Sequence, residues 1–392
     1  MSAKGPSGSA EPPLSGQPGG SAEPPLSGQP GGSAEPPLSG FTTLRTGGPA
    51  GRVIVAETDT QLIEAVAAAD AAGEPITILG GGSNVVISDD GLPGTVVLVR
   101  TRGIDVSVDS CSGAWVTVAA GESWDDLVAR AVADEWSGLE ALSGIPGLTG
   151  GTPIQNVGAY GQEVADTIAR VTAYDRETSR TEVIAAGDCG FGYRNSRFKS
   201  DPGRYVVLSV TFQLPLGALS APIGYAELAS RLGVAVGERA PASEVRAAVL
   251  DLRRGKGMVL DPADHDTWSV GSFFTNPIVE ASRVPEGAPA WPAEPSATPG
   301  TVDAELPDPA SGSSGLVKTS AAWLVEQAGF PRGYPEGGAA RLSTKHTLAI
   351  TNRGSASTAD VLSLAREIRA GVRDRFGIEL VAEPVQLGCS LD

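Results

Sequence analysis

The chain has 392 residues, of which 41% are hydrophobic, and its formal net charge at pH 7 is -17. This length and apolar content predict two or three folded domains with sizeable buried cores, and no membrane insertion, because no run approaches the roughly 18 apolar residues of a membrane span. The acidic balance argues against nucleic acid and anionic membrane surfaces as partners, since both attract basic proteins.

The cysteines indicate a reducing environment. Cys111, Cys189 and Cys389 are odd in number, lie far apart and include no CxxC spacing. Neither a disulfide framework nor a zinc site is therefore indicated, and no metal ligand set is predicted. The first residues also lack the apolar core of a signal peptide. We expect a cytoplasmic protein.

Two stretches have the composition of unfolded chain. Residues 1–40 contain the repeat "SAEPPLSGQPGG", which starts at residue 9 and again at residue 21. Pro, Gly and Ser dominate it, so it cannot bury enough apolar surface to offset the entropy of ordering, and a solenoid would need a hydrophobic face in every repeat. Residues 281–314 are similar in composition and are predicted to form a mobile surface insertion.

The patterned chain opens with alternating strands and helices. "RVIVAE" (52–57), "PITILG" (75–80) and "TVVLVR" (95–100) are predicted strands, and residues 59–73 are a predicted helix. This alternation is typical of an α/β arrangement.

Half-exposed strands follow at 105–110 and 114–120, and a helix at 123–136 begins with a capping signal at Ser123 and Asp126. Residues 204–214 form a strand that ends before Pro215, where we place a domain boundary. The helix predicted over 357–377 ends at Gly377 and has one apolar face. That face contains Val361, Leu364, Ile368 and Val372.

A glycine-rich loop follows the strand at 75–80. Its consecutive glycines allow backbone N–H groups to form an anion-binding nest, to which a serine and an asparagine add neutral donors. A pyrophosphate would suit this loop, although Val85 breaks the GxGxxG spacing and an ordinary tight turn remains an alternative. The loop consists of Gly80, Gly81, Gly82, Ser83 and Asn84.

A longer glycine-rich loop, "SGIPGLTGGTPIQNVGAYGQE", spans residues 143–163. It combines permissive glycines with prolines and the amides of Gln155 and Asn156, and it has almost no charge before Glu163. We interpret it as the wall of a site for a large, flat ligand with polar edges, in preference to a simple connector.

Two further segments contain reactive residue types. In "CGFGYRNSRFK" (189–199), Arg194, Arg197 and Lys199 accompany three aromatic residues; they form either a solvated loop or a fixed positive charge for a carboxylate or phosphate. In "SVGSFFTNP" (269–277), Ser272 stands between a glycine and two phenylalanines.

A nucleophilic serine needs a base, usually a histidine, and the chain has only His265 and His346. His265, within the acidic "DPADHDTW", is interpreted as a surface or supporting residue. Ser272 is therefore either structural or part of a chemistry that differs from that of a hydrolase.

Seven segments, in order, resemble one family: the UDP-N-acetylenolpyruvoylglucosamine reductases, or MurB family, flavoproteins of peptidoglycan precursor synthesis. The resemblance spans roughly residues 41 to 390. The matching segments are "FTTLRTGGPA", "GGGSNVVISDDG", "SGIPGLTGGTPIQNVGAYGQE", "FGYRNSRFK", "GSFFTNP", "SAAWLVEQAGF" and "FGIEL".

The resemblance implies an α+β fold with an FAD-binding domain of the vanillyl-alcohol-oxidase (PCMH) type, made of subdomains at about 41–104 and 105–215. An α+β substrate-binding domain would cover 216–375, and residues 376–392 would return to the active site. The residues implied in FAD binding are Gly80, Gly81, Gly82, Ser83, Asn84, Gly144, Ile145, Pro146, Gly147, Gln155, Asn156, Gly158, Ala159 and Tyr160.

The implied reaction has two halves: NADPH, the co-substrate, reduces FAD, and a hydride then passes to the methylene carbon of a UDP-linked enolpyruvyl amino sugar. The product would be UDP-N-acetylmuramate. By motif position, Arg194 would stabilise the enolate-like intermediate, Ser272 would donate a proton, and Glu383 would assist Arg194. Glu383 lies in "VAEPV", where relatives commonly have Glu-Pro-Glu-Val.

The resemblance also implies substrate contacts, including a tyrosine that closes over the substrate in relatives with a lid. The lid tyrosine is matched by Tyr225, and packing roles remain open for Tyr225 and Gln327. Thr275 replaces a lysine found in many relatives, which removes one expected phosphate contact. A monomer or weak oligomer is expected. The implied substrate residues are Tyr193, Tyr225, Lys256, Asn276 and Gln327.

The sequence also allows two alternative functions. A flavin oxidase of the same fold would turn over rapidly with oxygen on a sugar alcohol or lactone. A non-catalytic nucleotide-sugar binding protein would keep the fold without the reaction, although the presence of Arg194, Ser272 and Glu383 argues against it.

Overall fold

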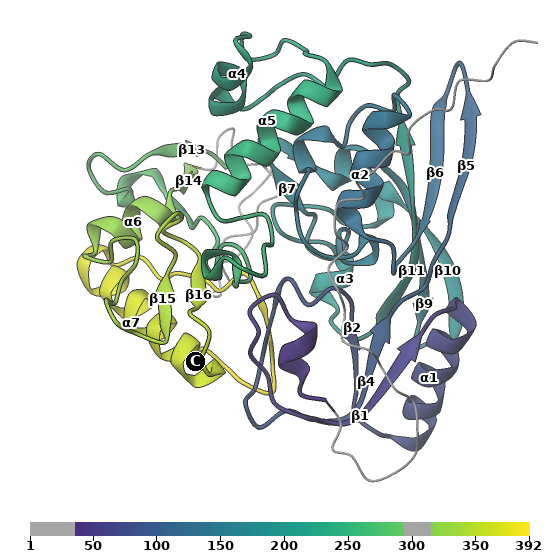
Figure 1. Cartoon of the computed structure of the whole chain (residues 1–392), viewed down its shortest axis with the longest axis horizontal. Helices are drawn as coiled ribbons and strands as arrows, with labels where there is room; N and C mark the ends of the chain where they lie inside the picture. Colours follow the sequence, from purple (N-terminus) through teal and green to yellow (C-terminus); the bar gives the residue numbers. More distant parts are fainter. Residues whose placement is uncertain (1–35, 294–314) are drawn as a thin grey trace, which may run out of the picture. The chain divides into compact units, whose positions relative to one another are not determined.

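The computed structural model describes residues 36–293 and 315–392 (Figure 1). Most of the predicted N-terminal tail and residues 294–314 of the predicted insertion lie outside these ranges. The folded chain begins before residue 40, because the 3₁₀ segment Leu38–Phe41 contains a fully buried leucine, Leu38, whose backbone N–H donates to the Gly48 carbonyl at 2.8 Å. The predicted tail boundary at residue 40 is thus a few residues too late.

The first sheet is parallel and has the strand order β1–β4–β2, with β1 at Ala50–Ala56, β4 at Leu92–Val99 and β2 at Ile76–Leu79. Helix α1 (Asp59–Ala72) packs along it (Figure 1) and buries Leu62 and Val66. The predicted α/β opening is confirmed.

The second sheet is antiparallel, in the order β10–β9–β11–β6–β5. The predicted strands at 105–110, 114–120 and 204–214 are confirmed as β5, β6 and β11. Helix α2 (Trp124–Ala133) begins at Ser123, whose hydroxyl accepts from the Asp126 N–H, so the predicted cap is also confirmed. The strand bounds are Arg180–Ala185 (β10), Ile168–Asp175 (β9), Tyr205–Leu214 (β11), Gly113–Ala119 (β6) and Ile104–Asp109 (β5).

One core lies between α2 and this sheet. The Trp124 and Phe212 rings, both fully buried, have centroids 5.9 Å apart. Next to α2, α4 (Ala226–Leu232) packs on α5 (Ala242–Gly255) around a small separate core that includes Leu228 and Val249.

The last part of the chain forms a third α+β unit, at the left of Figure 1. It has a sheet β12–β14–β13, a hairpin β15–β16 and two helices, and Phe273, Phe274 and Leu324 lie in its core. Within the predicted insertion, residues 290–292 therefore form a strand that pairs with β14. The bounds are Ile278–Glu280 (β12), Leu316–Thr319 (β14), Ala290–Pro292 (β13), Ala340–Leu342 (β15), Ile350–Asn352 (β16), Ala321–Gln327 (α6) and Thr358–Phe376 (α7).

Helix α7 confirms the helix predicted over 357–377. Ser357 caps its start and Gly377 ends it with a φ of 65°, a left-handed conformation that glycine adopts without strain. The four residues of the predicted apolar face are each at most 4% exposed.

The chain then returns to its beginning. Strand β17 (Val385–Leu387) pairs in parallel with β3 (Val85–Ile87), which directly follows the first glycine loop. This pairing places the residues just before β17 beside that loop.

Several short elements complete the described chain, and no helix within it is long and apolar enough to cross a membrane. These elements are the two-residue strands β7 (Gly158–Ala159) and β8 (Gln162–Glu163), the helix α3 (Arg197–Ser200), and 3₁₀ turns at Glu140–Leu142, Thr149–Gly151, Val164–Asp166, Ala186–Asp188, His265–Thr267 and Ala281–Arg283.

Candidate active site

The two glycine-rich loops touch each other. A Cβ added to Gly81 would lie 2.7 Å from the Cα of Gly147, and one added to Gly147 would lie 2.6 Å from the Ser83 Oγ. Gly82 has a φ of 61°, and a Cβ there would lie 2.0 Å from the Phe41 carbonyl oxygen. The loops approach this closely only because these positions have no side chain.

Amide side chains fix the loops further. The Asn84 side-chain amide donates to the side-chain Oε1 of Gln155, which ties the first loop to the second. Asn156 is 1% exposed and holds the second loop together: its Nδ2 donates to Glu163 and its Oδ1 accepts from the Ala165 N–H. Both polar atoms of the Asn156 amide thus form hydrogen bonds within the protein.

The second loop also meets the α5 helix. The Gly144 N–H donates to the Asp125 carboxylate at 2.6 Å, and a Cβ there would lie 2.8 Å from Leu250. Gly144 therefore faces α5, while Ile145, Pro146, Gly158 and Ala159 are half-buried along the same loop.

Arg194 lies at the centre of a tight turn between Gly192 and Asn195, whose backbones exchange hydrogen bonds of 3.0 and 3.1 Å. Its φ is 52°, a left-handed conformation that is uncommon for a side-chain-bearing residue. Its Nη2 donates to the Gly158 carbonyl at 2.9 Å, and Lys199 Nζ donates to the Arg194 carbonyl at 3.0 Å. The turn is held from both sides.

Glu383 meets Arg194 from the C-terminal segment. Its Oε1 lies 3.0 Å from Arg194 Nε. Its backbone N–H donates to the Phe273 carbonyl at 2.9 Å, and the Thr275 N–H donates to the Val381 carbonyl at 3.0 Å, so this segment runs antiparallel to the one that follows Ser272.

Ser272 stands at the start of that paired segment. Phe273 and Phe274 are 0% and 2% exposed and anchor it in the core. The Ser272 side chain is half-buried, and its hydroxyl has no hydrogen-bonding partner among the described residues. Backbone pairing therefore gathers the three predicted catalytic residues.

The ionisable groups around Arg194 have shifted pKa values. Burial raises the pKa of Glu383, against the opposing charges of Arg194 and Lys199. Burial also raises the pKa of Glu163 and lowers that of Lys199. Buried, mutually interacting charges of this kind are typical of functional sites.

Tyr193, next in the turn, packs under a cation, Lys318, that no pattern in the sequence marked as a site residue. Lys318 Nζ lies 4.4 Å from the centroid of the Tyr193 ring. Asn276, predicted to contact substrate, uses its Oδ1 to accept from the Ala321 N–H at the start of α6, at 3.0 Å. Glu163 was missed as well, although it is the first charge at the end of a nearly uncharged loop.

A second group gathers around Tyr160. Its ring meets that of Tyr225 edge-on with centroids 5.6 Å apart, and Lys256 Nζ lies 5.6 Å from the Tyr160 centroid. Lys256 also pairs with Glu227 at 2.6 Å, and Tyr225 is 45% exposed. Tyr160, predicted as a cofactor residue, thus lies with two predicted substrate residues, while Gln327 is exposed at the end of α6.

Comparisons with known proteins agree with this geometry. Residues 50–183 match the family of FAD binding domains, and residues 261–387 match the C-terminal domain of UDP-N-acetylenolpyruvoylglucosamine reductase. The UDP-N-acetylenolpyruvoylglucosamine reductase of Salinispora arenicola is 56% identical over 356 residues, covering 90% of this chain and 94% of the relative. The enzyme of that name from Cutibacterium acnes is 54% identical over 352 residues, covering 89% of each chain.

A solved structure extends the comparison to the fold. The crystal structure of the UDP-N-acetylenolpyruvylglucosamine reductase (MurB) from Thermus caldophilus aligns with a TM-score of 0.58 at 26% identity, over 89% of this chain and 97% of the other. The predicted FAD-binding α+β fold is confirmed. From these matches, which cover most of the described residues, we conclude that the chain belongs to the UDP-N-acetylenolpyruvoylglucosamine reductase family.

Proposed function

We propose that the chain reduces UDP-N-acetylenolpyruvoylglucosamine to UDP-N-acetylmuramate for peptidoglycan synthesis, with FAD as its cofactor and NADPH as the reductant. The observation that carries this proposal is the meeting of Arg194, Glu383 and the Ser272 segment beside the two glycine loops. We also propose that it works in the cytoplasm, which the three free cysteines support.

The glycine loops fit FAD. Between Gly81 and Gly147 there is no room for a Cβ, so the two backbones can present N–H groups to a pyrophosphate at close range. Ser83 and Asn84 add neutral donors, and the half-buried stretch from Gly158 to Tyr160 supplies a wall for a flat ring. FAD bound here supplies the hydride chemistry, which protein side chains lack.

Arg194 would stabilise the negative charge that develops on the substrate carboxylate. Within the described chain its Nε, Nη1 and Nη2 donate to Glu383, Asn156 and Gly158. A guanidinium has five N–H donors, so two remain for a carboxylate. Because the turn fixes the guanidinium before substrate arrives, little reorganisation is needed during the reaction.

Glu383 can assist Arg194 in its protonated form. Burial raises its pKa, and a substrate carboxylate nearby would raise that pKa further by adding negative charge. In the protonated form it can donate a hydrogen bond to the developing enolate, while Arg194 supplies the positive charge.

Ser272 completes the reaction by protonating the carbon next to the carboxylate. Its hydroxyl has no hydrogen-bonding partner among the described residues, so it is available to substrate, and the buried Phe273 and Phe274 hold its backbone in place. No histidine base is needed, because the serine donates a proton to an enolate and is not acylated.

Replacement of Gly81 tests the FAD site. Gly81→Ala should lower the FAD content of the purified protein several-fold, because the new Cβ would have to displace the Gly147 backbone. Gly151→Ala is the matched control, since a Cβ there meets nothing within 4 Å. The measurement is flavin absorbance relative to protein, with circular dichroism to verify folding. Equal FAD in the two variants would refute the assignment of this loop.

Replacement of Ser272 separates the two half-reactions. Ser272→Ala should leave FAD reduction by NADPH nearly intact and slow substrate reduction by roughly 10²- to 10⁴-fold, as loss of a general acid does. Ser272→Cys should keep part of the rate. Stopped-flow absorbance measures both halves, with Thr275→Ala as a control hydroxyl on the same segment. Equal slowing of both halves by Ser272→Ala would rule out a proton-donor role.

The pH profile tests the protonation state of Glu383. Its pKa in the folded protein is raised, so the acid form is present at low pH and is lost as the pH rises through that pKa. Substrate reduction should therefore fall on the alkaline side, and Glu383→Gln, which stays neutral, should remove this fall. Single-turnover rates across the pH range provide the measurement. If instead the rate fell on the acid side and Glu383→Gln removed that fall, the carboxylate would be the active form.

A further inference from the structure

His346 is one of the two histidines of the chain, and the proposed reaction gives it no role. It lies in the loop between β15 and β16, which contacts the active-site segment: the Leu348 carbonyl accepts from the Phe273 N–H at 2.8 Å, next to Ser272. The neighbouring Thr347 hydroxyl donates to Glu326, beside Gln327 in α6. The loop thus lies between Ser272 and one of the predicted substrate residues.

The ring of His346 has one nitrogen engaged and one free. Its Nδ1 accepts from the Leu348 N–H at 3.1 Å, so in the neutral ring the proton is on Nε2. No described residue hydrogen-bonds to Nε2. The tautomer is therefore fixed, with an N–H donor available to a ligand.

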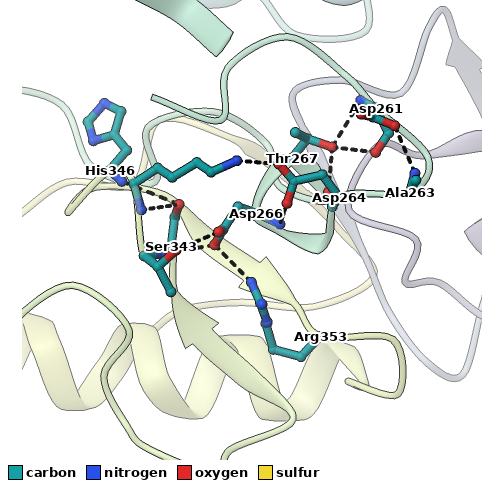
Figure 2. Close-up of polar contacts among 10 residues, drawn as sticks. Asp261, Ala263, Asp264, Asp266, Thr267, Ser343, His346 and Arg353 are labelled. Atoms are coloured by element: carbon teal, nitrogen blue, oxygen red, sulfur yellow. Dashed lines mark hydrogen bonds and ion pairs between the residues drawn. The ribbon is translucent and has the colours of Figure 1, made fainter. Parts of the chain in front are cut away.

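The loop is anchored independently of this ring. Asp266 accepts from the Thr344 N–H at 2.9 Å and pairs with Arg353 at 2.8 Å, and Asp264 pairs with Lys345. In Figure 2 the His346 ring points away from this network of polar contacts. The imidazole is thus not needed to hold the loop to the 261–267 segment.

Several charged side chains act on the His346 ring. Burial lowers the pKa of His346 to about 4, and the charges of Lys256, Arg253 and Arg332 lower it as well, against the opposing charge of Glu326. His346 is therefore neutral near pH 7. Lys256, which also belongs to the Tyr160 group, pairs with Glu227, and Arg332 lies 3.8 Å from Glu326. The buried Arg253 Nε, in contrast, has no hydrogen-bonding partner among the described residues, so an anionic ligand can be accommodated here.

We propose that the Nε2–H of His346 donates a hydrogen bond to the diphosphate of the nucleotide sugar, beside Lys256. This inference rests on the proposed function and adds a binding residue to it. A neutral N–H donor suits a phosphate oxygen that nearby cations also contact, because it adds a hydrogen bond and does not repel those cations. Arg194 and Ser272 then act at the enolpyruvyl end of the same molecule.

Two amide substitutions distinguish ligand binding from a role in the turn. In His346→Asn the amide can replace Nδ1 as the acceptor for the Leu348 N–H but cannot reach the Nε2 position. In His346→Gln the amide reaches the Nε2 position and can donate there. Binding should therefore weaken roughly 10- to 100-fold in His346→Asn, the effect of losing a hydrogen bond to a charged group, and only a few-fold in His346→Gln.

The probe is UDP-N-acetylglucosamine, which has the diphosphate but lacks the enolpyruvyl group, so Arg194 and Ser272 do not contribute. Calorimetric titration of the FAD-loaded full chain measures its affinity, and thermal unfolding verifies that each variant is folded. The matched control is His265→Gln, which should bind as tightly as the unaltered chain, because the His265 ring packs on Trp268 outside this group.

The binding results test the role of His346 separately from the proposed reductase function. Weak binding by His346→Asn with near-normal binding by His346→Gln supports the inference. Unchanged binding by His346→Asn, or weak binding by His346→Gln alone, overturns it while the reductase activity stands. If the unaltered chain binds neither this probe nor the enolpyruvyl substrate, the proposed function itself fails.

Discussion

The pairing of the C-terminal segment with two distant segments of the chain holds the candidate active site together. β17 pairs with β3, which follows the first glycine loop, and the Glu383 N–H donates to the Phe273 carbonyl beside Ser272. These backbone bonds bring a buried carboxyl group to Arg194. Leaving the Glu383 carboxyl or the Arg194 guanidinium without this partner would be destabilising, so the pairing and the Arg194–Glu383 contact depend on each other.

The loop at 143–163 joins the two groups of site residues. The Gly158 carbonyl accepts from Arg194, and two residues later the Tyr160 ring meets Tyr225 and Lys256. A ligand along this loop would reach a charge-stabilising centre at one end and aromatic and basic side chains at the other. The left-handed φ of Arg194 costs on the order of 1–3 kcal/mol, which the surrounding contacts must offset.

The sequence predicted the elements that have a local signature. The spacing of apolar residues and the capping residues predicted the helices and strands, and the conformational freedom of glycine predicted the two loops. Each of these elements is present. The seven ordered segments identified the family. The roles of Arg194, Ser272 and Glu383 remain predictions, although the structure brings these residues together.

What could not be predicted depends on contacts between distant segments. The antiparallel pairing of residues near 274 and 382 has no local signal, so residue patterns could not place Glu383 beside Phe273, and only the family resemblance implied that this segment returns to the site. The positions of Lys318 over Tyr193 and of Gly144 against α5 likewise come from packing. The sequence indicated His346 only as one of two histidines that could serve a serine nucleophile. That one nitrogen of its ring is engaged and the other is free becomes evident only from the Leu348 contact.

The most direct test of this account is the flavin spectrum of the unaltered protein under anaerobic conditions. NADPH should bleach the yellow protein, and UDP-N-acetylenolpyruvoylglucosamine should then restore the colour without oxygen, because the substrate is the electron acceptor. A protein that takes up no FAD, or one that stays bleached with this substrate and regains its colour only with oxygen, would contradict the account.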